Sequence, residues 1–145
     1  MMVKKTLIFL SILIFFSHCK KDENEDVFII NIKSTQPVSL QEFQENVMVT
    51  ISYIHPNGYV GFFDPDYLSL EVKDSRLTNP DYYHLIPVTP PNQSLSVQGE
   101  LLIQIDAPFI FGNGLTETLT YDIRIQDINK QWSNKVTTSE ITVNR

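Results

Sequence analysis

Carboxylate pairs are the side chains of this sequence that most directly suggest a reaction. Asp64 and Asp66 flank Pro65, and Asp74 and Asp81 bracket a short polar stretch. Two acids held on either side of a glycosidic bond can hydrolyse it, one as the acid and the other as base or nucleophile. Acids next to proline in turns more often accept hydrogen bonds from the backbone of the turn itself. We therefore expect turn bracing, and we keep a small hydrolase or lyase acting on polysaccharide through a carboxylate pair as the alternative.

Histidine and cysteine residues are too few to predict a metal site or a nucleophilic site. Apart from His18, the chain contains His55, His84 and the single cysteine Cys19. A zinc site needs three or four nitrogen, sulfur or carboxylate ligands, usually at short spacing. A catalytic triad needs a histidine beside a nucleophile and an acid, and neither histidine lies in a motif of that kind. We interpret His55 as a turn residue and His84 as part of a short strand or loop, and we expect no enzyme, no metal and no cofactor.

The segment 55–66, HPNGYVGFFDPD, resembles an aspartate- and glycine-rich turn of Bacteroidota surface lipoproteins with immunoglobulin-like domains. In that pattern closely spaced carboxylates could hold calcium, which takes roughly six to eight oxygen ligands. Three aspartates of the pattern are replaced here, by His55, Asn57 and Tyr59. We therefore expect a plain turn. The candidate calcium ligands that remain are Asn57, Asp64 and Asp66.

The first residues have the order of an exported bacterial lipoprotein. Two lysines precede an apolar run at 7–16, which is too short to span a bilayer as a helix. Residues 16–19, Phe-Ser-His-Cys, resemble the lipobox, whose cysteine receives a diacylglyceryl group and becomes the first residue of the mature protein. As the only cysteine, Cys19 has no partner for an intramolecular disulfide. We expect residues 1–18 to be a cleaved lipoprotein signal peptide and Cys19 to be lipidated.

Residues 19–26, CKKDENED, are a charged tether whose composition indicates the cellular location more specifically. The composition predicts an extended, solvated spacer, and it resembles the tethers of lipoproteins displayed on the surface of the Bacteroidota. The resemblance implies anchoring to the outer membrane by the acyl chains on Cys19, facing the cell exterior, with the periplasmic face as the alternative. The chain has 11 basic and 17 acidic residues. We expect no nucleic-acid partner, because binding to nucleic acid depends on lysine and arginine at the phosphates.

Alternation of apolar and polar residues predicts strands through the rest of the chain. Such a period of two is typical of a strand with one buried face, and no run beyond the leader has the period of a helix. Seven strands are expected, at 28–32, 47–53, 68–73, 82–86, 95–105, 119–126 and 141–143. The residues expected to share one core are Val49, Ile51, Leu70, Ile103, Ile105, Ile123 and Ile125.

Turn residues rich in glycine, proline and asparagine separate these strands. The pattern predicts an all-β fold, an immunoglobulin-like antiparallel β-sandwich of about seven strands over residues 27–145. The stretch 122–143 resembles the last hairpin of bacterial immunoglobulin-like modules, and we expect Trp132 within it to cover the open end of the core. The resemblance to surface lipoproteins of this kind implies no particular activity.

Aromatic residues are concentrated in the predicted loops, as Phe62, Phe63, Tyr67, Tyr82, Tyr83, Phe109 and Phe111. Exposed on one edge, they would form a platform for a sugar ring or a protein; facing inward, they would close the ends of a small core, which we expect. The candidate binding residues are Tyr82, Tyr83, Phe109, Phe111 and Trp132. The sequence therefore favours a lipid-anchored, non-catalytic binding or accessory module whose loops contact a protein or a glycan.

Overall fold

The computed structural model describes residues 27–87 and 96–145. Cys19, the predicted signal peptide (1–18) and the predicted tether (19–26) lie outside the described residues. The two described ranges form ten strands and no helix, and hence no helix that could cross a membrane. The strands are β1 (Ile29–Gln36), β2 (Ser39–Gln41), β3 (Val47–His55), β4 (Leu68–Asp74), β5 (Asp81–His84), β6 (Val97–Ile105), β7 (Thr116–Leu119), β8 (Tyr121–Ile125), β9 (Val136–Thr137) and β10 (Ile141–Asn144).

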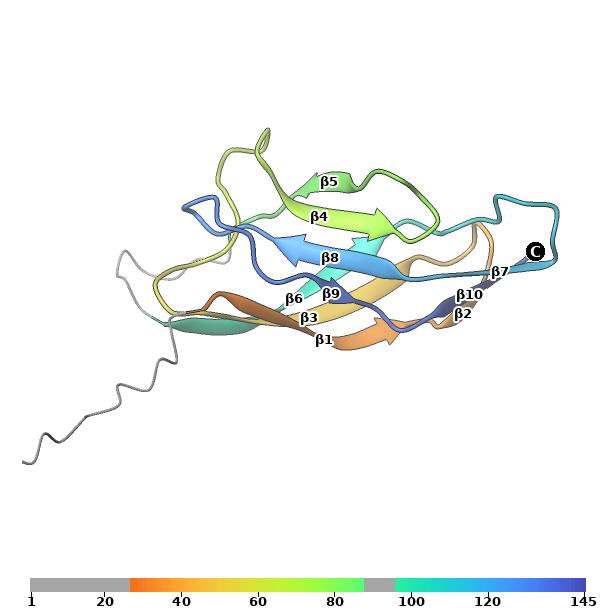
Figure 1. Ribbon diagram of the computed structural model, residues 1–145, viewed down its shortest axis with the longest axis horizontal. Helices are drawn as coiled ribbons and strands as arrows, with labels where there is room; N and C mark the ends of the chain where they lie inside the picture. The colour runs from red at the N-terminus through yellow and green to blue at the C-terminus, as the bar shows by residue number, and fades with distance from the viewer. Residues whose placement is uncertain (1–26, 88–95) are drawn as a thin grey trace, which may run out of the picture.

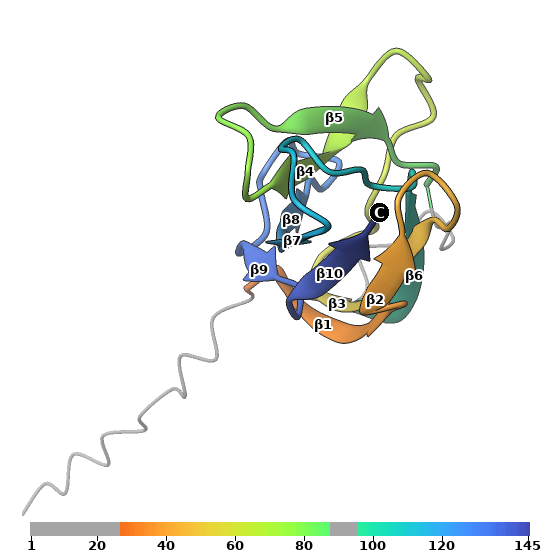
Figure 2. The ribbon, with the colours of Figure 1, turned by 90° about the vertical axis from the view of Figure 1, so that its right-hand side faces the viewer.

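The strands form three small sheets, with the orders β1-β3-β6, β2-β10-β7 and β5-β4-β8-β9. Every pair is antiparallel except β2 with β10, which is parallel. Only Thr120 separates β7 from β8, so the second and third sheets follow one another along the same stretch of chain. Figure 1 shows β5, β4 and β8 in an upper layer and β6, β3 and β1 in a lower one, and Figure 2 shows the same layers from the end where β2 lies beside β10.

The first stretch of the domain takes part in two sheets. β1 pairs with β3, where Ile30 lies opposite Tyr53, and the register shifts between Ile32 and Ser34. Beyond Pro37 the chain leaves the β1-β3-β6 sheet, and β2 pairs with β10. Proline has no amide hydrogen to give to a β-ladder, so it suits the break between the two strands.

Aliphatic side chains from both layers form one core. All seven residues that the sequence predicts to share it are buried, which confirms the period read from β3, β4, β6 and β8. The burial of β6 alternates over its last five residues, Leu101 to Ile105, with Leu102 and Gln104 exposed between buried neighbours. The all-β class is therefore confirmed for the described residues.

The central strand β4 departs from simple alternation, because Ser69 to Val72 are all buried. Glu71 points to the outer face, where Tyr82 of β5 and Arg124 of β8 lie opposite it in the sheet. Their long side chains cover the carboxylate, so the outer face of β4 is shielded from water as well. A buried charge of this kind is stable only when paired.

The number of strands differs from the seven that alternation predicts. Each predicted strand overlaps an observed one, and the three additional strands are β2, β7 and β9. They are two to four residues long, and a period of two cannot be recognised over so few residues. Their pairing with strands far along the chain, rather than their own sequence, makes them strands.

Candidate functional site

Three phenylalanine rings form an exposed ladder at one end of the molecule. Phe43, between β2 and β3, stacks on Phe109, between β6 and β7, with ring centroids 5.1 Å apart and planes 10° apart. Phe111 meets Phe109 edge to face, with centroids 5.0 Å apart. The three side chains are 67%, 41% and 46% exposed in the order Phe43, Phe109, Phe111. We call these three residues the Phe ladder.

The backbone holds Phe43 in an unusual conformation. Its φ of 62° lies in the left-handed region, which bulky residues adopt only when the surroundings require it. The amide of Phe43 donates a hydrogen bond to the carbonyl of Pro108 at 3.3 Å. This bond fixes the loop that carries Phe43 to the loop that carries Phe109, so the stacked pair joins two loops that are distant in sequence.

Arg76, in the loop between β4 and β5, contacts the Phe ladder at Phe109 and Phe111. Its guanidinium donates three hydrogen bonds to Asp74, at 2.6, 3.0 and 3.2 Å, and one each to Glu117, at 3.1 Å, and the Phe109 carbonyl, at 2.8 Å. The same group lies 4.2 Å from the centroid of the Phe111 ring, a cation–π contact. Burial by itself lowers the pKa of Arg76, but the bonds to Asp74 and Glu117 raise it above its ordinary value. Arg76 is therefore a permanent positive charge with all its partners inside the molecule.

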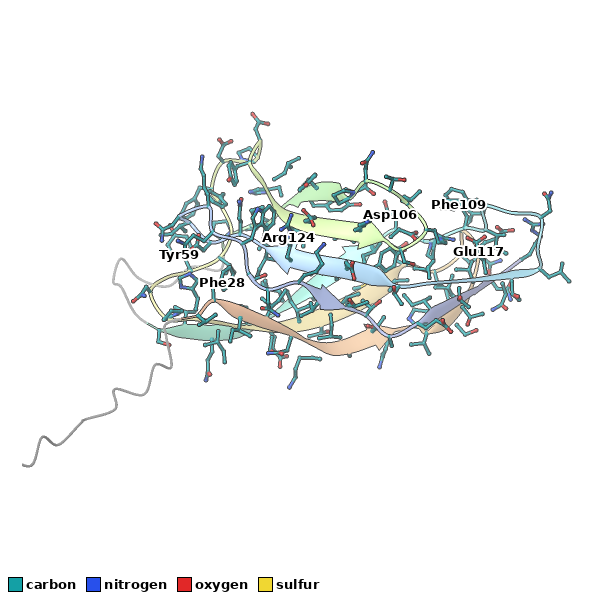
Figure 3. The ribbon with its side chains drawn as sticks, viewed as in Figure 1. Phe28, Tyr59, Asp106, Phe109, Glu117 and Arg124 are labelled. Atoms are coloured by element: carbon teal, nitrogen blue, oxygen red, sulfur yellow. The ribbon has the colours of Figure 1, made fainter. Side chains whose placement is uncertain are left out.

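A cavity of about 200 Å³ opens beside the Phe ladder, between the β4–β5 and β6–β7 loops. Asp81 and Asp106 line it together with the aromatic rings of Tyr83, Phe109 and Tyr121. Figure 3 labels Asp106 and Phe109 near one another at this end of the molecule. Burial, followed by the charges of Asp81 and Asp106, raises the pKa of Tyr83. Both carboxylates therefore lie close to the Tyr83 hydroxyl and line the same cavity, which we call the acidic cavity.

Tyr82 and Trp132 lie on another surface, the outer face of the β5-β4-β8-β9 sheet. The Arg124 guanidinium is 4.5 Å from the centroid of the Trp132 ring, and the Tyr82 ring lies 6.5 Å from that ring. Arg124 also donates a 2.6 Å hydrogen bond to Glu71, and Lys135 lies 3.9 Å from the same carboxylate. Burial by itself raises the pKa of Glu71, but the hydrogen bonds from Arg124 and Tyr82 and the two positive charges outweigh it and lower the pKa.

The position of Trp132 differs from the expectation that it covers the open end of the core. Trp132 forms an isolated β-bridge with Gln126, which directs its ring to the side of β8 where Arg124 projects. The aliphatic residues of β8, Ile123 and Ile125, point to the opposite face and are fully buried. Trp132 therefore covers an ion pair on the outside of the sheet.

The expectation that the loop aromatics face inward is wrong for five of them. Aliphatic residues together with Phe28, Tyr53 and Tyr121 fill the core, so none of the seven loop aromatics is needed to close it. The five exposed residues are Phe63, Tyr82, Tyr83, Phe109 and Phe111. Of the candidate binding residues, Phe109 and Phe111 lie together in the Phe ladder with Phe43, which the sequence does not single out. Tyr83 lines the acidic cavity. Tyr82 and Trp132 lie on a different surface, the outer face of the β5-β4-β8-β9 sheet.

His55 and Asp127 form a buried pair that sequence reasoning missed. His55 Nε2 lies 3.0 Å from Asp127 Oδ2, and His55 Nδ1 accepts the amide hydrogen of Asn57 at 3.1 Å. The ring hydrogen is therefore on Nε2, which donates it to the carboxylate. Asp127 Oδ1 accepts two further hydrogen bonds, from the amides of Asn129 at 2.9 Å and Gln131 at 2.7 Å. Because both nitrogens of the ring are engaged, this pair is not arranged to accept a proton from a nucleophile.

The interpretation of His55 as a turn residue is wrong. It is the last residue of β3, its side chain is buried, and its ring packs 4.8 Å from that of Phe28. His84 lies in β5, as expected, and its Nε2 is 2.7 Å from the carbonyl oxygen of Phe62. Asp127 precedes the turn residues 128–131, and an aspartate in that position indicates hydrogen bonds to the backbone of the turn. Nothing in the local sequence indicates that His55 is its partner.

The turn at 55–66 uses its acids within the turn. Asp64 Oδ1 accepts the amide hydrogen of Asp66 at 3.0 Å, the bracing that the sequence predicts. The amide of Asn57 is bonded to His55. Over 27–87 and 96–145, no three histidine, cysteine, aspartate or glutamate side chains lie close enough to hold a metal ion. Of the other predicted carboxylate pair, Asp74 is taken by Arg76, and Asp81 lines the acidic cavity.

Comparisons of the chain with models of protein families, with curated proteins and with solved structures found no match.

Proposed function

We propose that this chain is a non-catalytic binding or accessory module of the bacterial outer membrane. In this proposal the acyl chains on Cys19 anchor it, facing the cell exterior, and an immunoglobulin-like β-sandwich presents loops that contact a protein or a glycan. The observation that carries the proposal is the Phe ladder, in which two loops are held together so that three apolar rings face solvent. Clusters of exposed aromatic residues are typical of interaction sites.

The order of the strands supports the immunoglobulin-like part of the proposal. One layer has the order β1-β3-β6 and the other contains β5-β4-β8-β9. These orders correspond to strands A, B and E and to strands C′, C, F and G of immunoglobulin domains. The pairing of β2 with β10 places a continuation of the first strand beside the last one.

The location of the Phe ladder supports its role as a contact surface. Figure 3 shows Phe28, beside the start of β1, toward one end of the long axis, and Phe109 toward the other. A chain anchored through Cys19 is attached on the side of Phe28, and the ladder then points away from the anchor. An exposed apolar surface in that position is accessible to a partner outside the cell, because the membrane does not cover it.

Site-specific photo-crosslinking in intact cells tests this proposal. Phe43 is replaced by p-benzoyl-phenylalanine in the anchored chain, and the control carries the same replacement at Phe63, which is 72% exposed against 67% for Phe43. Phe63 contacts Tyr59, which lies at the opposite end of the molecule. We expect a discrete adduct from position 43, identified by mass spectrometry as protein or glycan, and its loss on Phe109→Ala. No adduct from position 43, or equal adducts from both positions, would overturn the proposal.

One observation favours the alternative, a hydrolase or lyase acting on polysaccharide, because Asp81 and Asp106 line one cavity. Both residues are exposed, however, and a catalytic acid is normally kept protonated by an apolar, buried environment. The two readings are separated by incubating the purified chain with cell-surface polysaccharide. Release of reducing ends or unsaturated products, abolished by Asp106→Asn, would establish the alternative in place of the proposal.

A further inference from the structure

The charges around the acidic cavity do not cancel. Asp74, Asp81 and Asp106 line it, and Arg76 is its one lining residue with a positive charge. Arg76 is already paired with Asp74 and with Glu117, which lies beside the cavity. Within the described part of the chain, Asp81 and Asp106 have no ion-pair partner. Two uncompensated carboxylates therefore face the same small volume.

The walls of the acidic cavity contain aromatic rings and acceptor oxygens. Tyr83, Phe109 and Phe111 line it, and the face of such a ring attracts a cation; Arg76 already lies over one face of Phe111, and Phe43 stacks on one face of Phe109. Tyr121 also lines the cavity and is only 5% exposed, and its hydroxyl donates or accepts no hydrogen bond among the described residues. Burial, together with the charge of Asp74, raises the pKa of Tyr121 to about 12, so this hydroxyl stays neutral.

The size of the acidic cavity limits what it can hold. Its 200 Å³ is below the range of about 300–1,000 Å³ that is typical of small-molecule sites. A single side chain fits such a volume better than a run of sugar rings. The carboxylates of Asp81 and Asp106 only accept hydrogen bonds when ionised, which suits a cationic group that carries several donors.

We propose that the acidic cavity binds the cationic side chain of an arginine or lysine on a protein partner, while the Phe ladder packs on apolar residues next to it. This inference rests on the proposed function, because it names the chemistry of the partner that this end of the module contacts. Arginine is favoured over lysine, since its planar guanidinium can stack on a ring of the wall while it donates hydrogen bonds to a carboxylate. The partner is thus a protein with a basic side chain beside an apolar patch.

The test uses N-acetyl-arginine amide as the probe and N-acetyl-citrulline amide as its neutral isostere. The full chain, ¹⁵N-labelled and in detergent micelles, is titrated with each compound while its backbone amide signals are recorded. We expect arginine, but not citrulline, to shift the amides of 75–81 and 106–111 in a saturable way. Saturable shifts of equal size with citrulline, or none with arginine, would overturn the inference.

Two double variants make the test specific to the acidic cavity. Asp81→Asn with Asp106→Asn removes its free charges, and we expect at least tenfold weaker arginine binding while the remaining spectrum stays unchanged. Asp64→Asn with Asp66→Asn removes the same charge at the opposite end, and we expect binding to be retained. Equal weakening in both variants would assign the effect to net charge and overturn the site.

The failure of this inference is distinguishable from failure of the proposed function. If position 43 crosslinks normally in the Asp81→Asn, Asp106→Asn variant and arginine does not bind the wild-type chain, the module has a partner that does not use the acidic cavity. If arginine binds as expected but position 43 gives no adduct, the cavity is a cation site and the proposed contact surface is wrong.

Discussion

His55 Nε2 and Asp127 Oδ2 are 3.0 Å apart, although 72 residues separate them in the chain. The bond joins the end of β3, in one layer, to the residue that opens the turn after β8, in the other. Both side chains are buried, at 5% and 1% exposure. The pair therefore ties the two layers together at the end of the molecule opposite the Phe ladder.

Loss of this tie is expected to lower the free energy of unfolding. His55→Ala leaves Asp127 Oδ2 without its donor in a buried site, and a hydrogen bond to a charged group contributes about 1.5–3 kcal/mol. Urea denaturation measures the change. Asp64→Asn, in an exposed turn, is the control and should change the free energy by less than about 0.5 kcal/mol. Equal effects of the two changes would mean that the pair is not a structural tie.

The alternation in β6 predicts opposite effects for neighbouring residues. Ile103 is buried and Gln104 is exposed, and truncation of a buried isoleucine to alanine typically costs about 2–5 kcal/mol. Ile103→Ala should therefore lower the unfolding midpoint in urea sharply, and Gln104→Ala should hardly move it. Similar small shifts from both would place the core elsewhere.

Acid should destabilise the domain partly through Glu71. The pKa of Glu71 in the folded state lies below the ordinary value of 4.5, so the unfolded chain takes up the proton first as the pH falls. The stabilisation from the Glu71–Arg124 pair is thus complete above about pH 4.5 and is lost as the pH falls through the lower pKa of the folded state.

Stability curves against pH for Glu71→Gln and the wild type test this linkage. We expect the variant to be less stable near neutral pH and to lose less stability on acidification. The control is Glu100→Gln, which changes an exposed acid 3.9 Å from Lys33 in the β1-β3-β6 sheet. Its stability should depend on pH as steeply as that of the wild type. An unchanged slope in Glu71→Gln would contradict the lowered pKa.

Calcium is expected to leave the stability unchanged, since the acids of the 55–66 turn serve the turn itself. A ligand that binds only the native state stabilises it by RT ln(1 + [L]/Kd), about 2.7 kcal/mol at a hundredfold excess over Kd. Thermal melts with and without millimolar calcium would reveal such a site. A rise of several degrees that Asp64→Ala abolishes would make Asp64 and Asp66 calcium ligands.

Lipidation at Cys19 is expected from the order of the leader. Mass spectrometry of the protein isolated from membranes should find an acylated cysteine as the first residue, and Cys19→Ala should release the protein from the membrane fraction. An N-terminus upstream of Cys19, or a membrane association that does not respond to Cys19→Ala, would contradict the lipoprotein assignment.

Local patterns predicted the framework of the molecule better than its contacts. Alternation is visible within a single strand, which is why Val49, Ile51 and Ile103 could be placed in the core from sequence alone. The partner of Asp127 lies 72 residues away, and no pattern within either segment indicates that they meet. Pairing across such distances is set by the order of the strands in the sheets.

The Phe ladder was predicted only in part for a similar reason. Phe109 and Phe111 are close in sequence to one another and drew attention as loop aromatics. Phe43 belongs to another loop, and its stacking depends on a left-handed backbone and a bond to Pro108. Neither feature has a signal in the local sequence, because glycine or asparagine is the usual residue at a positive φ.

The parallel pairing of β2 with β10 has a consequence for how the chain folds. Asn144 donates a hydrogen bond to the carbonyl of Leu40, 104 residues earlier, whereas β1 and β3 meet across a much shorter loop. Closing a long loop costs more entropy, so pairs of high sequence separation form late. β2 therefore gains its strand partner only when β10 is in place, so this edge of the described domain closes after the pairing of β1 with β3.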